Sequence, residues 1–251
     1  MTKQNEISES GITLLLPTDS SYAKELENLG FDDSLLKERG LCPVIFKNCS
    51  LRTVVAFRVD WEVEDSTGFI WNLSCPFMQP ECLRDGHLLR STQYLAPPGA
   101  LLLFTVRGHI WKPELVQNEA SRFASEPHAI VSARIDAAIF DDGAVVGPDK
   151  GGSVARFKAM VDGRQDSLEE IAFRLSLGHS LHEIVTTIRS EKVDADPHDP
   201  EFYYHMFRQN LVSDLFAVEL LYDEQVAIST VASYKYHVRP NIHRIGSGPA
   251  R

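Results

Sequence analysis

The segment TVVAFRVDWEVED, residues 53–65, constrains the fold more than any other stretch of the chain. Apolar and charged residues alternate along it. The apolar set is Val55, Phe57, Val59, Trp61 and Val63, and the charged set is Arg58, Asp60, Glu62 and Glu64. A period of two places successive side chains on opposite faces of a β-strand. The segment therefore predicts a strand with one face in a core and the other in water.

Several neighbouring segments have the same character. The candidate strands are residues 42–50, 68–74, 87–97 (the weakest candidate), 100–106 and 128–140. In the last of these, Ala129, Val131, Ala133, Ile135, Ala137 and Ile139 form one predicted face. Residues 101–104 are apolar throughout, as in a strand that is buried on both faces. Most connections are too short for a crossover helix, which predicts antiparallel pairing and a β-sandwich.

Helical patterns flank the predicted strands. Leucines in residues 22–39 predict two short helices that are interrupted near Gly30. Apolar residues recur at helical spacing after Ser167 and after Ser180, and each serine has a glutamate three positions later, which indicates a capping box. A third helix is predicted from Asp199 to Tyr222, with Pro200 in its first turn, and it is apolar on more than one side. We expect two domains, residues 1–149 and 150–251.

The strings VVAFRVDWEVED, LAPPGALLLF and IDAAIFDDGAVVGPD resemble a group of uncharacterised bacterial proteins. In that group similar strings mark an immunoglobulin-like sandwich followed by helices. The resemblance covers roughly residues 40–190 and carries no established activity. It implies an α+β fold: an antiparallel immunoglobulin-like β-sandwich with short N-terminal helices and an α-helical C-terminal part. Cys75 and Cys82 come too early to supply the late-strand cysteine of an immunoglobulin disulfide.

Residues 135–153, IDAAIFDDGAVVGPDKGGS, contain four aspartates, four glycines and a serine. This composition is typical of metal loops and phosphate loops, but the spacing fits neither. The segment lacks the alternating ligands and final glutamate of an EF-hand, and it lacks the lysine that precedes the hydroxyl residue of a P-loop. Asp-Gly between two apolar runs is a hairpin signal, because glycine readily adopts positive φ. We expect a turn between two structural units, with Ser153 as the cap of the next helix.

Charge and cysteine content exclude some partners and favour a compartment. The chain has 251 residues, a net charge of −10 and no run of five basic residues, so we expect no nucleic-acid partner. Its longest apolar runs are too short to cross a membrane. The N-terminal MTKQNEISES lacks the apolar core of a signal peptide. The four cysteines show no CxxC spacing, so we expect reduced thiols, with a disulfide or a metal site as alternatives. These features favour a cytoplasmic location, unless a leader peptide has been removed.

Two clusters in the helical region have metal-ligand chemistry. His179 and His182 are three residues apart, and Asp196 and His198 lie in the acidic segment 194–201. Histidine nitrogens and carboxylates are common zinc ligands. The first cluster lacks HExxH spacing, however, and the second has the composition of a connection between two helices. We expect no metal and no other cofactor.

The residues favour a non-enzymatic binding or structural module. Its expected partner is another protein or a second copy of the chain in a homodimer. The alternative is a metal-dependent hydrolase that uses His179, His182, Asp196 and His198. No GxSxG or GxGxxG motif supports nucleophilic or dinucleotide chemistry.

Overall fold

The computed structural model describes residues 11–78, 96–110, 112–234 and 242–244. These residues fall into two units. The first contains the described residues up to 153 together with 243–244, and the second contains residues 154–234 and 242. The chain is a mixed α+β protein with antiparallel sheets and several helices. The predicted strand at 87–97 lies outside the described residues except for its last two positions.

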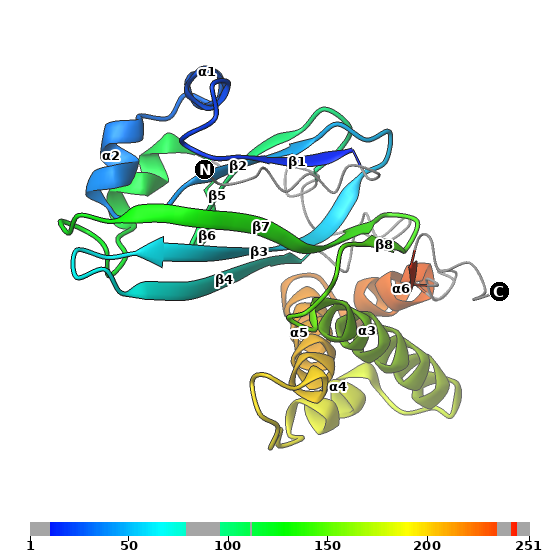
Figure 1. The fold of residues 1–251 in the computed structure, drawn as a ribbon. Helices are drawn as coiled ribbons and strands as arrows, with labels where there is room; N and C mark the ends of the chain where they lie inside the picture. The colour runs from blue at the N-terminus through cyan, green and yellow to red at the C-terminus, as the bar shows by residue number, and fades with distance from the viewer. Residues whose placement is uncertain (1–10, 79–95, 111, 235–241, 245–251) are drawn as a thin grey trace. The chain divides into compact units, whose positions relative to one another are not determined.

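The first unit contains two sheets (Figure 1). One has four antiparallel strands in the order β1-β2-β5-β6: Ile12–Leu15, Val44–Asn48, Leu101–Thr105 and Gly108–Ile110. The other has the order β4-β3-β7-β8-β9: Ile70–Met78, Val54–Glu64, Ala129–Phe140, Ala144–Val146 and His243–Arg244. Among the strand pairs of the described residues, β8–β9 alone is parallel. The short strands β1, β6 and β9 were not predicted as strands, whereas β8 is the second strand of the hairpin predicted at Gly143.

Aromatic side chains of the two sheets meet in one hydrophobic core. Phe57 of β3 stacks on Phe46 of β2 with ring centroids 3.9 Å apart, and Trp61 of β3 stacks on Phe104 of β5 at 6.0 Å. Trp61 is only 1% exposed. The predicted core face of β3 is confirmed from Phe57 to Val63, whereas Val55 lies at a bulge and Val54 takes its place in this core.

Bulges break two of the predicted alternations. In the pairing of β3 with β7, the register shifts at Val55 of β3 and at Val131 and Asp136 of β7. A bulge inserts one unpaired residue and reverses the facing of the residues beyond it. The core side of β7 therefore runs through Ala133 and Ile135 and continues at Ala138 and Phe140. The prediction that Ala137 and Ile139 share a face with Ala133 was wrong for this reason.

Two short helices cover the outer face of the four-stranded sheet, as Figure 1 shows. They are α1 (Tyr22–Asn28) and α2 (Asp33–Glu38), and they confirm the prediction of two helices interrupted near Gly30. Leu26 and Leu36 of these helices pack with Leu103 of β5, whose neighbour Phe104 faces the opposite core. Strand β5 is thus buried on both faces. A 3-10 helix, η3 (Pro113–Asn118), follows β6.

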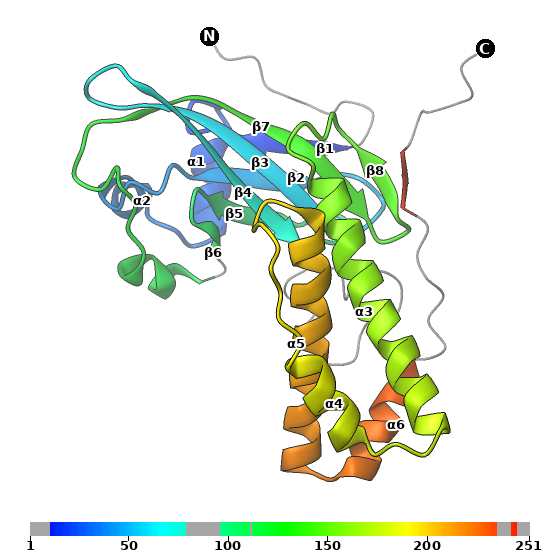
Figure 2. The ribbon, with the colours of Figure 1, turned by 90° about the horizontal axis from the view of Figure 1, so that it is seen from below.

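The second unit contains most of α3 (Ser153–Ser176) together with α4 (Leu181–Arg189), α5 (Pro200–Leu221) and α6 (Glu224–Tyr234) (Figure 2). Their apolar faces form a separate core that includes Ile171, Ile184, Leu215 and Val231. Arg208 of α5 is only 8% exposed and pairs with Glu170 of α3 and with Glu191. Helix α6 was not predicted.

The expected helix start at Ser167 was wrong, because α3 is continuous through it. The Ser167 hydroxyl donates a hydrogen bond to the carbonyl of Gly163, 2.7 Å away, one turn back in the same helix. Ser153 is the first residue of α3, and its buried hydroxyl has no hydrogen-bond partner among the described residues, so the expected cap is not formed. The box at Ser180 is confirmed: Ser180 and Glu183 bond each other's backbone N–H groups. Asp199 precedes α5 as expected, without a side-chain cap.

Gly163 allows α3 and α5 to approach closely. A Cβ atom built at Gly163 would lie 2.2 Å from the carbonyl oxygen of Tyr204. Since that oxygen belongs to the backbone, a side chain at position 163 would force the helices apart.

Of the described helices, none combines the length and the hydropathy required of a membrane-spanning segment.

Candidate functional site

The two histidines of the first predicted cluster lie at the start of α4. His182 contacts the α5 side chains Glu219, with 3.5 Å between Nδ1 and Oε1, and Phe216, with 6.0 Å between ring centroids. His179 precedes the cap residue Ser180. Glu183, the adjacent carboxylate, accepts the backbone N–H of Ser180, and this hydrogen bond lowers the pKa of the Glu183 carboxyl.

The second predicted cluster lies in the connection before α5. The Asp196 carboxylate accepts the backbone N–H of His198 at 2.8 Å, and the His198 carbonyl accepts a hydrogen bond from Arg156 at 3.3 Å. The Asp196 bond lies within the connection, and the His198 carbonyl ties the connection to Arg156 of α3. Among the described residues, no three His, Cys, Asp or Glu side chains gather in a group that could hold a metal ion. The four candidate ligands of a hydrolase are not brought together.

The segment 135–153 forms the turn that its glycines predict. Strands β7 and β8 pair as a hairpin around Gly143, whose φ is +83°, and the Asp142 carboxylate accepts the N–H of Ala144 at 2.9 Å. The bulged Asp136 is completely buried, and its carboxylate oxygens accept the N–H groups of Lys150 and Gly151 at 2.8 and 2.7 Å. These aspartates hold the loop that leads into α3.

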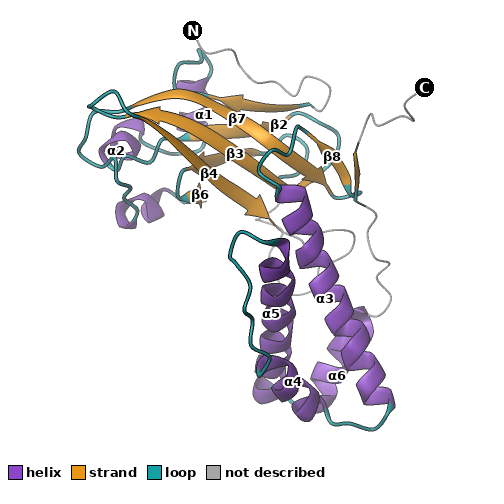
Figure 3. Ribbon diagram, turned by 60° about the horizontal axis from the view of Figure 1, so that its bottom comes forward, coloured by secondary structure: helices purple, strands orange, loops and turns teal. Residues whose placement is uncertain are grey.

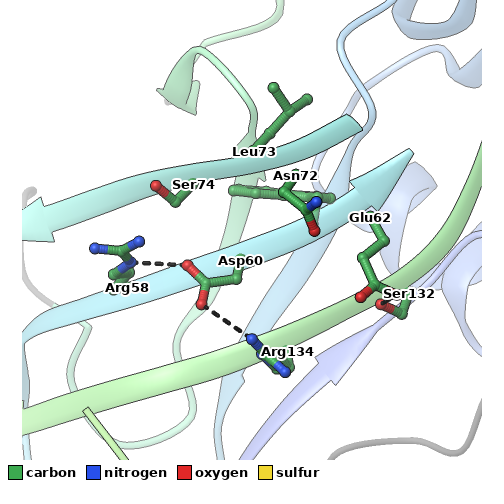
Figure 4. Close-up of a pocket in the computed structure, with 9 residues that line it drawn as sticks. Arg58, Asp60, Glu62, Asn72, Leu73, Ser74, Ser132 and Arg134 are labelled. Atoms are coloured by element: carbon green, nitrogen blue, oxygen red, sulfur yellow. Dashed lines mark hydrogen bonds and ion pairs between the residues drawn. The ribbon is translucent and has the colours of Figure 1, made fainter. Parts of the chain in front are cut away.

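A polar groove of about 160 Å³ lies on the outer face of the five-stranded sheet (Figure 4). Strands β3, β4 and β7 form it, and their outward side chains supply its charged and hydroxyl groups. The labelled polar residues are Arg58, Asp60, Glu62, Asn72, Ser74, Ser132 and Arg134. This is the solvent-facing side of β3 that the alternation of apolar and charged residues predicts.

Three of the four charged groups of the groove are paired with one another, and the fourth, Glu62, accepts a hydrogen bond from a serine. Arg58 Nε donates to Asp60 at 2.7 Å, and Arg134 Nη2 lies 3.7 Å from the other oxygen of Asp60. Ser132 donates to Glu62 at 2.7 Å. Arg58 also donates to the carbonyl of Gly151 at 3.1 Å, and its side chain is only 16% exposed. Two arginines and two carboxylates bonded in this way stabilise the sheet face and offer a neutral polar surface.

The second unit carries a different surface, an apolar end. Nine large apolar side chains are strongly exposed among the described residues, and six of them lie at the turns α3–α4 and α5–α6. We call these six the apolar end: Phe173, Leu177, Leu220, Leu221, Tyr222 and Val226. Figures 2 and 3 place both turns at the same end of the helical unit. Exposed apolar clusters of this kind mark interaction sites on proteins.

A hydrogen bond joins the two turns. The backbone N–H of Leu181, the first residue of α4, donates to Glu224 Oε1 at 2.8 Å. Charged residues of opposite sign flank the apolar side chains. Arg174 lies beside Phe173, and Asp223 and Glu224 follow Tyr222. The apolar end is thus an ordered surface with Arg174, which is paired with Glu170, near one turn and two acidic residues in the other.

The sequence predicted the apolar end only in part. The apolar residues of α5 around 211–221 exceed one helical face, and the structure divides them. Leu211, Val212 and Leu215 are buried in the helical core, whereas Leu220 and Leu221 are exposed. Periodicity could not assign them, because the position of α6 decides which side of α5 is covered.

Comparisons of this chain with protein-family models, with curated proteins and with solved structures find no match. The function is therefore argued from the geometry and chemistry of the described residues.

Proposed function

We propose that the protein is a non-enzymatic binding module that associates through the apolar end of its helical unit. The two units act as separate domains, divided near residues 149 and 150, and the β-rich domain is the scaffold. The protein works in the cytoplasm without a metal or other cofactor. The observation that carries this proposal is the concentration of exposed apolar side chains at one end of the second unit.

The scaffold is proposed to be an immunoglobulin-like sandwich. The orders β1-β2-β5 and β8-β7-β3-β4 correspond to the immunoglobulin strand orders A-B-E and G-F-C-C′. In that comparison Trp61 lies on strand C, where immunoglobulin domains have a buried tryptophan. Strand β6 departs from the pattern, because it follows β5 in the chain whereas strand D precedes E. Phe46 lies on strand B, and its ring stacks on Phe57 of strand C in the opposite sheet.

A second copy of the chain is the proposed partner of the apolar end. In a two-fold dimer both copies use the same surface, so that surface must be complementary to itself. The basic part of one copy then faces the acidic part of the other. The Arg174 side would then lie over Asp223 and Glu224 of the second copy, and the leucines would meet between them. Charge complementarity of this kind fixes the register of an interface, while apolar burial supplies most of the affinity.

The test is sedimentation velocity of the full chain and of two aspartate variants. Leu221→Asp places a carboxylate in the proposed interface, where its desolvation opposes association. Leu51→Asp is the matched control, because Leu51 is 95% exposed in the first unit. We expect a concentration-dependent dimer whose dissociation constant rises about tenfold or more in Leu221→Asp and is unchanged in Leu51→Asp. Equal dissociation constants for the Leu221→Asp and Leu51→Asp dimers would overturn the proposal.

A further inference from the structure

A pocket of about 380 Å³ opens in the first unit, where β1 ends and β2 and β7 begin. Small-molecule sites in proteins commonly have volumes of about 300–1,000 Å³ and mostly apolar linings. This pocket lies at the end of the two sheets and shares no residue with the polar groove or the apolar end.

The floor of the pocket belongs to the hydrophobic core. Leu16, Cys42 and Pro43 are buried residues that line it, and Leu16 and Cys42 are members of the core cluster between the sheets. Burial raises the pKa of the Cys42 thiol to about 12, so the thiol is uncharged near neutral pH. A molecule seated here would place its apolar part on the core of the sandwich without meeting a charge.

The backbone at the floor has an unusual conformation. Cys42 has a φ of +47°, in the left-handed region that residues other than glycine rarely occupy. This conformation turns the chain from Gly40 into β2, and the thiol points back to the carbonyl of Gly40 at 3.7 Å. Such strained residues are frequent at ligand sites.

The rim carries one cation and one anion. Lys37 of α2 is paired with Asp33 at 2.6 Å, and Glu126 lies in the segment that leads into β7, two residues before His128. The His128 ring packs on Phe123 with centroids 5.4 Å apart, and its Nδ1 lies 3.0 Å from the carbonyl oxygen of Glu126. Because Lys37 is already paired with Asp33, the mouth has no unpaired cation to attract an anionic ligand, while the imidazole offers a hydrogen bond.

We propose that the first unit binds an uncharged, mostly apolar small molecule in this pocket. Its size is that of a substituted aromatic ring or a medium-chain alcohol. The apolar part lies on Leu16, Cys42 and Pro43, and a polar group meets His128 at the mouth.

The test uses N-phenyl-1-naphthylamine, an uncharged dye that fluoresces in apolar surroundings, with the full-length chain. The measurements are made in a Leu220→Asp/Leu221→Asp background, so that dye bound at the apolar end does not contribute. Ala129→Trp and Thr18→Trp each add a large side chain at the rim and fill the pocket. Ala23→Trp, on the exposed side of α1, is the matched control.

We expect saturable binding of one dye per chain, displaced by 1-octanol and not by octanoate. The dissociation constant should rise about tenfold or more in the two pocket variants and stay unchanged in Ala23→Trp. Binding that persists in both pocket variants, or an absence of saturable binding, would overturn the site. Displacement by octanoate as effective as that by 1-octanol would overturn the choice of an uncharged ligand, and this comparison requires no variant of the pocket.

Discussion

The backbone N–H of Leu181 donates a hydrogen bond to the Glu224 carboxylate at 2.8 Å, so the first turns of α4 and α6 are held together. The N–H groups of a helix's first turn have no partner within the helix. Glu224 satisfies one of them from a residue that lies 43 positions later in the chain. The apolar end is ordered at this bond, although most of its side chains face solvent.

Removal of the Glu224 carboxylate should destabilise the apolar end. Leu181 is completely buried, so Glu224→Ala leaves its N–H without an acceptor at a cost of about 1–3 kcal/mol. We expect a lower free energy of unfolding in urea and weaker self-association. Glu224→Gln keeps an oxygen acceptor and should lose less than half as much. Equal losses of unfolding free energy in Glu224→Ala and Glu224→Gln would show that the hydrogen bond to Leu181 does not stabilise the protein.

Arg208 should be the most sensitive charged residue of the helical unit. Burial alone would lower the pKa of Arg208, but hydrogen bonds to Glu191 and Glu170 raise it above its ordinary value. Arg208→Ala leaves both carboxylates without this partner, and we expect a loss of about 3 kcal/mol in unfolding free energy. Arg174→Ala removes a more exposed partner of the same Glu170, and its expected loss is under about 1 kcal/mol. If urea titrations give similar losses of unfolding free energy for Arg208→Ala and Arg174→Ala, Arg208 is not the more sensitive residue.

Gly163→Ala should destabilise the protein. In an ordinary helix interior this substitution stabilises by about 0.5–1 kcal/mol, because glycine loses more backbone entropy on folding. Here the new Cβ would lie 2.2 Å from the Tyr204 carbonyl oxygen, so α3 and α5 must separate. We expect the unfolding free energy to fall by about 1–3 kcal/mol, as for other overpacked sites. A stabilised variant would mean that the two helices do not approach at this point.

Local pattern predicted strand β3 well and strand β7 only in part. In β3 the alternation from Phe57 to Val63 identified both the strand and its buried face. The alternation in β7 looks the same in sequence, yet the bulge at Asp136 reverses its later half and the bulge at Val131 shifts its first residues. A bulge depends on the register with a distant strand, which no local pattern records.

The helical region shows the same limit. Ser180 and Ser167 both begin a Ser-x-x-Glu pattern, but only Ser180 caps a helix. Segment 224–234 contains the β-branched residues Val226, Ile228, Thr230 and Val231, which are weak helix formers. It is helical because Ala227 and Val231 pack in the core of the second unit, and tertiary burial outweighs propensity. The apolar end could not be located from sequence, because its limits depend on where α6 packs.

Stability should depend on His109 in mildly acidic solution. Burial lowers the pKa of His109 from 6.5 to about 4. Between these values the unfolded chain binds a proton that the folded chain does not, so unfolding is favoured as the pH falls. The contribution of the neutral His109 to the unfolding free energy is fully present above pH 6.5 and is lost as the pH falls toward 4. We expect the unfolding free energy to fall less in His109→Gln than in the unmodified protein, measured by urea titration at about pH 7 and about pH 5. Equal falls would contradict the burial of this imidazole.

The central claim is that the helical unit's apolar end joins two copies of the chain. Static light scattering of the full chain over a range of micromolar concentrations tests it most directly. The account predicts a mass that rises with concentration to twice the chain mass of 28.2 kDa and no further, because a two-fold interface closes on itself. A mass that stays at 28.2 kDa up to high micromolar concentration would contradict it.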